Sequence, residues 1–189
     1  MRASALATVL LLHRQASASH FRYGTIHWSL RDPQGAPTTV TFRVSYGILS
    51  SSPPNLRTVT LDFGDGADSG ALAGPVVGKF SDPAGQSFDV RELVVKHTYA
   101  AAGTYTAFFD ACCRIAGLVN GANQTYHVSS VVSLQPGNSA GPVSASLPVV
   151  ELQLGAPRTY VWPVLDPDGD PITCRFGTDA ETGFADAVP

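Results

Sequence analysis

Hydrophobic and polar residues alternate with a period of two along most of the chain. The segment TVTFRVSY, residues 39–46, shows this pattern clearly, because Val40, Phe42 and Val44 fall on one face. Such alternation is typical of β-strands that bury one face, and no segment has the period and caps that predict an α-helix. We therefore expect strands near residues 23–30, 38–46, 57–63, 74–80, 88–98, 103–112, 125–135, 143–154, 158–164 and 171–176.

Segments rich in glycine and proline, such as GDGADSG and SDPAGQ, separate the expected strands. Short strands at this spacing predict an all-β fold, a β-sandwich. The polar segment QPGNSAGP marks a boundary, so we assign residues 19–137 to a first sandwich and 138–142 to a linker. Residues 143–189 are expected to be the start of a second sandwich, because about 50 residues bury too little surface to complete one.

The N-terminus has the pattern of an exported protein. A positively charged MRAS is followed by the apolar run ALATVLLL and by the small residues ASA at 16–18. This order predicts a secretory signal peptide over residues 1–18, with a buried N-terminal strand as the alternative. No apolar run reaches the roughly 20 residues that span a bilayer. We therefore expect an extracellular or cell-surface protein, with no membrane span within this chain.

Charge and motif content exclude several classes of function. The net charge is −3, only 14% of residues are charged, and basic residues form no block. Nucleic acid is therefore not an expected partner. The sequence contains no GxSxG, HExxH, phosphate-binding loop or dinucleotide-binding fingerprint, so we expect a protein that is not an enzyme.

The segment TLDFGDG, residues 60–66, has three interpretations: a metal loop, a catalytic carboxylate pair or a sharp turn. Asp62 and Asp65 are suited to capping backbone amides, and Gly64 and Gly66 permit positive φ angles. An EF-hand counted from Asp62 fails, because glycines occupy its third and fifth positions. We favour a structural turn.

Two further residues are expected to support this turn. His97 is expected to hydrogen-bond to the carboxylate of Asp62 or Asp65. The hydroxyl group of Tyr99, which also precedes the turn AAG, is expected to donate to a backbone carbonyl group, as tyrosines at sandwich corners do.

The segments LDFGDG (61–66), KHTY (96–99) and AAGTYTAFF (101–109) resemble, in that order, the PKD domain family. The resemblance covers roughly residues 40–135 and implies an extracellular Ig-like β-sandwich, in tandem with adhesion or carbohydrate-related modules. Leu61 stands where that family has tryptophan, and SHFRYGTIHW near the N-terminus is outside its pattern. Within this stretch Phe21, Tyr23 and Trp28 are expected in the core, with a sugar-stacking surface as the alternative.

A second acidic cluster, DPDGDP at 166–171, is the candidate metal site. Asp166, Asp168 and Asp170 offer carboxylate oxygens, which suit a hard cation such as calcium. The surrounding VWPVLDPDGDPITCRF resembles the acidic turns of cadherin-like and Ig-like repeats, which implies calcium at a module junction. The alternative is an exposed acidic turn. Calcium is the one cofactor that the sequence suggests.

Cys112, Cys113 and Cys174 are the disulfide candidates in an exported chain. Their connectivity is open, although neighbouring residues on a strand point to opposite faces. The odd count leaves one thiol to pair with another chain or with a partner beyond Pro189. Asn123 begins the sequon NQT and is a candidate glycosylation site.

Two functions fit these observations. The first is a secreted or cell-surface modular glycoprotein that acts in adhesion or extracellular structural assembly, without catalysis. Its partners would be other extracellular proteins, copies of itself, or glycans. The alternative is a carbohydrate-binding accessory region of a larger secreted hydrolase.

Overall fold

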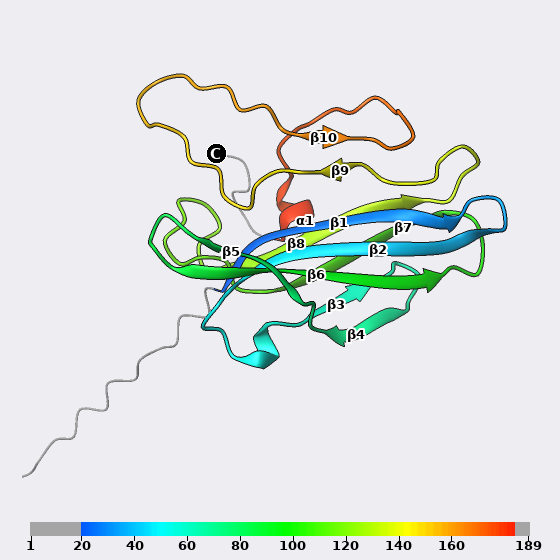
Figure 1. Cartoon of the computed structure of the whole chain (residues 1–189), viewed down its shortest axis with the longest axis horizontal. Coiled ribbons are helices and arrows are strands. Elements are labelled where there is room, and N and C mark those ends of the chain that lie inside the picture. The colour runs from blue at the N-terminus through cyan, green and yellow to red at the C-terminus, as the bar shows by residue number, and fades with distance from the viewer. Residues whose placement is uncertain (1–19, 184–189) are drawn as a thin grey trace, which may run out of the picture.

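Two antiparallel sheets of four strands each face one another in the computed structural model, which describes residues 20–183 (Figure 1). The predicted signal peptide, residues 1–18, lies outside the described residues. Sheet A has the order β1-β2-β6-β5, and sheet B has the order β4-β3-β7-β8. The strands of sheet A are β1 (Phe21–Asp32), β2 (Ala36–Leu49), β5 (Val76–Ser81) and β6 (Ser87–Thr98). The strands of sheet B are β3 (Val59–Asp62), β4 (Asp68–Leu72), β7 (Thr104–Cys112) and β8 (Thr125–Ser133).

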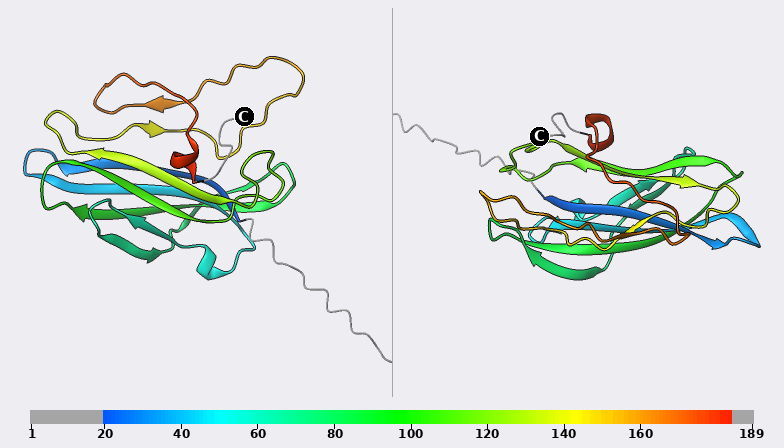
Figure 2. Two further views of the ribbon diagram at one scale, coloured as in Figure 1. Left: turned by 180° about the vertical axis from the view of Figure 1, so that it is seen from behind. Right: turned by 90° about the horizontal axis from the view of Figure 1, so that it is seen from above.

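The all-β sandwich predicted from the alternation is confirmed, and Figure 2 shows its two layers from above. Every sandwich strand except β4 overlaps a strand that the sequence predicts. The segment GDGADSG, residues 64–70, was expected to be a turn throughout, and this was wrong for its last three residues, which belong to β4 (Asp68–Leu72). β4 is an exposed edge strand, which pairs Leu72 with Val59 and lacks a buried face to give it an alternating pattern.

The hydrophobic core lies between the two sheets and is built from the alternating residues. Trp28 is 1% exposed, and its indole Nε1–H donates to the carbonyl oxygen of Val131 at 2.8 Å, so it joins β1 to β8. Phe21 is also buried and stacks on Tyr126, with ring centroids 3.6 Å apart. Phe21 and Trp28 are therefore core residues, and the sugar-stacking alternative is wrong for both. Tyr23 is half-buried.

The C-terminal part of the described chain contains little regular structure. Of the strands expected within residues 143–176, the structure has only the pair β9 (Val143–Ser144) and β10 (Val164–Leu165). Apolar residues such as Leu152 and Leu154 are exposed there, because no other described strand pairs with this segment to bury them. The predicted boundary and second module stay predictions.

Two short helices complete the described structure, namely the 3-10 helix η1 (Pro54–Leu56) and α1 (Asp179–Thr182). Figures 1 and 2 show β9 and β10 alongside the β1 side of the sandwich. Helix α1 lies near β8, where the Thr125 hydroxyl group donates to the carbonyl oxygen of Gly183. The C-terminal segment is therefore anchored to the sandwich at more than one point.

Candidate functional site

The acidic turn after β3 is held by its own side chains. Asp62 Oδ1 accepts a hydrogen bond from the Gly64 amide at 2.7 Å, and Asp65 Oδ1 accepts one from the Ala67 amide at 3.1 Å. Gly64 has a φ of 82°, and a Cβ atom there would lie 2.4 Å from the carbonyl oxygen of Thr106. Glycine at this position is required for both its backbone angle and its close approach to β7.

His97 and Tyr99 join this turn to β6. His97 Nε2 lies 2.7 Å from Asp65 Oδ2, and the imidazole ring stacks on Phe63 with centroids 4.1 Å apart. The Tyr99 hydroxyl group donates to the Phe63 carbonyl oxygen at 2.8 Å. Desolvation raises the pKa of Asp65, but the hydrogen bonds from His97 and Ala67 outweigh it and hold that pKa below its usual value. The carboxylate is thus committed to contacts within the protein, and a structural role remains the interpretation that fits.

The second acidic turn docks on the segment that follows β8. Asp168 Oδ2 accepts hydrogen bonds from the amides of Ser139 at 2.8 Å and Ala140 at 3.0 Å, and its Oδ1 accepts one from the Ser139 hydroxyl group. The hydrogen bonds from Ser139 lower the pKa of Asp168. Asp166 Oδ1 accepts from the Asp168 amide at 2.9 Å.

This docking changes the candidate metal site. Asp168 uses its carboxylate to hold residues 139 and 140, and Asp170 is exposed. Across residues 20–183, no group of three or more His, Cys, Asp or Glu side chains has an arrangement that would hold a metal ion. Calcium binding at Asp166, Asp168 and Asp170 stays a prediction.

The cysteines divide into a pair and an exposed thiol. A disulfide joins Cys112 to Cys113, and Cys174 is free and exposed. The expectation that the two neighbours point to opposite faces of a strand does not apply, because β7 ends at Cys112 and Cys113 lies beyond it. Asn123 is exposed in the turn between β7 and β8, with a φ of 56°. Its glycosylation stays a prediction.

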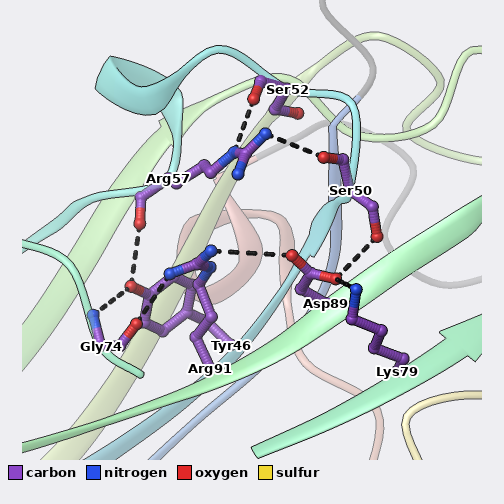
Figure 3. Close-up of polar contacts among 8 residues, drawn as sticks. All are labelled: Tyr46, Ser50, Ser52, Arg57, Gly74, Lys79, Asp89 and Arg91. Carbon is purple, nitrogen blue, oxygen red and sulfur yellow. Dashed lines mark hydrogen bonds and ion pairs between the residues drawn. The ribbon is translucent and has the colours of Figure 1, made fainter. Parts of the chain in front are cut away.

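A polar network at one end of the sandwich was not predicted from the sequence (Figure 3). Asp89 is its centre and is only 5% exposed. Its Oδ1 accepts a hydrogen bond from the Ser50 hydroxyl group at 2.7 Å and lies 3.9 Å from Lys79 Nζ. Its Oδ2 lies 3.6 Å from Arg91 Nη2. Asp89 and Arg91 are two positions apart in a predicted strand, so the sequence indicates that their side chains lie on the same face of the sheet. It gives no other signal of the network.

The same network fixes two loops. Arg57 donates from Nε to the Ser52 carbonyl oxygen at 2.6 Å and from Nη2 to the Ser50 carbonyl oxygen at 2.8 Å. The Tyr46 hydroxyl group donates to the Arg57 carbonyl oxygen and accepts from the Gly74 amide, both at 2.9 Å (Figure 3). The loops that follow β2 and β4 are therefore held to sheet A by buried and half-buried hydrogen bonds.

Comparison with known families corrects the PKD resemblance. A family model described as integrin beta-like protein A-E, N-terminal, matches residues 22–135, and no PKD domain is shown. The residues that carried the resemblance form a capped turn and a tyrosine-to-backbone hydrogen bond. Such contacts suit any sandwich that needs a sharp turn there, so they do not identify one family.

The curated relatives are integrin beta-like proteins of Dictyostelium discoideum. Integrin beta-like protein A is 28% identical over 179 residues, a match that covers 82% of this chain and 9% of the relative. Integrin beta-like protein C is 28% identical over 158 residues, covering 71% of this chain and 8% of the relative. The chain spans less than a tenth of the length of these relatives. No solved structure matches the chain, and no helix among residues 20–183 is long and apolar enough to cross a membrane.

Proposed function

Since the chain belongs to the family of the N-terminal region of integrin beta-like proteins A–E, we propose that it is a non-catalytic adhesion module displayed outside the cell. The observation that carries this proposal is the extent of the family match. Residues 22–135 coincide with the span from β1 to β8, so the family unit is the whole sandwich. We propose the adhesion role for this module alone, because the relatives are more than ten times longer than the matched region.

The rigid loops of the sandwich support a role in binding other molecules. The network around Asp89 and Tyr46 holds the loops at one end, and the contacts of Asp65 with His97 hold the turn at β3 (Figure 3). A hydrogen-bonded buried network favours one rigid arrangement, and among its buried side-chain atoms Arg91 Nε lacks a partner. A rigid module loses little conformational entropy when it binds. The disulfide between Cys112 and Cys113 suits an oxidising, extracellular compartment.

An adhesion assay tests the proposal. Beads coated with the chain are expected to attach to cells more than beads coated with albumin, and soluble chain is expected to compete. Surface biotinylation of expressing cells should label the protein. If labelling is absent and the coated beads attach no more than the albumin beads, the proposal is wrong.

The second candidate is homotypic assembly through β5, an edge strand of sheet A. Val77 is 59% exposed and Phe80 is 40% exposed on this strand. An exposed apolar edge strand is suited to pairing with another chain. Sedimentation should then show a dimer that Val77→Lys converts to a monomer, with Val119→Lys, at an exposed position outside the strands, as the matched control. A monomeric wild-type chain would rule this candidate out.

A further inference from the structure

A groove runs between β1 and the C-terminal segment from residue 142 to residue 162. It consists of two adjoining hollows of about 530 Å³ and about 470 Å³, which share Tyr23, Gly24, Thr25 and Ser144. Figure 1 shows the same arrangement, with β9 and β10 alongside β1. Concave sites of this size, with apolar walls and a few polar groups, are typical of ligand-binding sites.

Two aromatic side chains form a wall of the smaller hollow. Trp162 Nε1–H donates to Ser144 Oγ at 3.0 Å, and the Tyr160 hydroxyl group lies 3.0 Å from Ser146 Oγ. Trp162 is 58% exposed, whereas Trp28 in the core is 1% exposed. The hydrogen bonds fix the polar ends of the rings and leave their apolar surface accessible. The hollow therefore offers flat surfaces that are already positioned for a ligand.

The larger hollow offers backbone groups of the open edge of β1. The Leu30 amide donates to the carbonyl oxygen of residue 139 at 2.7 Å, and the Trp28 carbonyl oxygen accepts from the amide of residue 141 at 3.0 Å. The pairing with β2 has no bulge from Tyr23 to Leu30, so Gly24 and Ile26 face the same edge as Trp28. Within residues 20–183, no backbone hydrogen bond joins the outward groups of Gly24 and Ile26 to another strand or loop.

The charges of the groove cancel. Arg43 is the basic side chain and Glu92 the acidic one among its described lining residues, and they form an ion pair with each other. Burial lowers the pKa of His27, which also lines the groove, so its ring is neutral at physiological pH. A neutral ligand complements this site, because a charged ligand would have to compete with the existing ion pair.

We infer that this groove binds a neutral oligosaccharide. A pyranose ring has a face of C–H groups that packs on an aromatic ring, and hydroxyl groups that donate and accept hydrogen bonds. Trp162 and Tyr160 fit the C–H face, while the edge of β1 and the hydroxyl groups of Thr25 and Ser45 fit the sugar hydroxyls. The inference rests on the proposed adhesion function, for which it names the class of ligand.

An extended peptide is the competing occupant, because a peptide strand would also pair with Gly24 and Ile26. Gly24 lines both hollows, so the edge alone does not separate the two occupants. Backbone pairing at Gly24 and Ile26 makes no use of the aromatic wall of Tyr160 and Trp162, whereas the C–H faces of sugar rings pack on it. The observations therefore favour the saccharide.

Titration of the chain with soluble oligomers of glucose, of mannose and of N-acetylglucosamine tests the inference. Saturable binding of at least one series is expected, with a blue shift of the emission of Trp162 as the sugar covers its ring. Trp162→Ala should weaken binding at least about tenfold, and Trp162→Phe should retain part of it. Leu154→Ala is the matched control, since Leu154 is 97% exposed and lies outside the groove.

The outcomes separate this inference from the proposed function. Failure of all three series to bind, or equal affinity of Trp162→Ala and wild type, overturns the inference. Binding of an extended peptide with the sequence of residues 143–150 of this chain, VSASLPVV, without binding of saccharides makes the groove a strand-docking site and also overturns the inference. If coated beads attach to cells equally well with Trp162→Ala, adhesion stands and the saccharide site is not its basis. If saccharides bind but beads do not attach, only the proposed adhesion function fails.

Discussion

Substitution of Tyr46 by phenylalanine should destabilise the protein more than the same change at either of two other tyrosines. The Tyr46 hydroxyl group serves two backbone groups, because it donates to the Arg57 carbonyl oxygen and accepts from the Gly74 amide. Tyr46 is 0% exposed, its hydrogen bond with the Gly74 amide is buried, and its hydrogen bond with the Arg57 carbonyl oxygen is half-buried. Each buried group left without a partner costs about 1–3 kcal/mol. We expect Tyr46→Phe to lower the free energy of unfolding by roughly 2–4 kcal/mol.

Tyr99 and Tyr105 provide matched controls for this change. The Tyr99 hydroxyl group has one buried partner, the Phe63 carbonyl oxygen, so Tyr99→Phe should cost about 1–2 kcal/mol. The Tyr105 hydroxyl group donates to the carbonyl oxygen of Ala101 at an exposed position, where water replaces it, so Tyr105→Phe should cost about 0.5 kcal/mol.

Urea unfolding followed by circular dichroism measures the three changes. For a slope of about 1–3 kcal/mol/M, Tyr46→Phe should move the midpoint by on the order of 1–2 M. The slope itself should not change, because the folded state buries the same surface. If Tyr46→Phe and Tyr105→Phe shift the midpoint equally, the two hydrogen bonds of Tyr46 do not hold the loops as described.

Gly64→Ala should destabilise the protein more than Gly66→Ala, since both have positive φ angles but only Gly64 has a backbone oxygen 2.4 Å from a built Cβ. The left-handed backbone angle costs both variants about 1–2 kcal/mol, and the clash with the Thr106 carbonyl oxygen adds to this cost in Gly64→Ala only. Equal urea midpoints for the two variants would show that the clash does not matter. Asp168→Asn should speed hydrogen exchange at the amides of residues 139 and 140; unchanged exchange would mean that the turn is not docked. Because the pKa of Asp168 is lowered, its contribution to stability is present above the unfolded pKa and should be lost as the pH falls below about 4. Burial raises the pKa of Tyr126 to about 12, so stability should fall as the pH rises above about 10, the unfolded value, which unfolding at increasing pH would measure. Calcium should raise the melting temperature if the acidic turn binds it, and no shift at millimolar calcium would remove that prediction.

The period-two pattern predicted most of the sandwich, because each inner strand has one buried face. Val40, Phe42 and Val44 are all 0% exposed, as their alternation requires. The pattern did not predict the structure correctly in segments where buried and exposed residues do not alternate. β4 is an exposed edge, and apolar residues at 143–154 form no sheet because a strand also needs a partner, which local sequence does not specify.

Parts of the candidate site followed from local chemistry and parts did not. Asx turns depend on residues two apart, so the roles of Asp62 and Asp65 could be expected from their neighbours. The network of Asp89 with Ser50 and Lys79 joins three separate segments, and its members look like ordinary surface residues in sequence. The groove is still harder to foresee, because it forms between β1 and residues more than a hundred positions later.

The resemblance carried by LDFGDG, KHTY and GTYT has a physical explanation that does not require shared family membership. A strand that ends at the core needs a tight turn, which Gly64 permits and Asp62 caps. The strand facing it then supplies His97 for the turn carboxylate and Tyr99 for the backbone of Phe63. Each residue answers a local requirement of the sandwich, so the motif reports geometry. The family match over 22–135 instead spans the whole unit and includes β1, which lies outside the residues near 40–135 that the PKD resemblance covers. The extent of the match, and not the turn motif, therefore identifies the family.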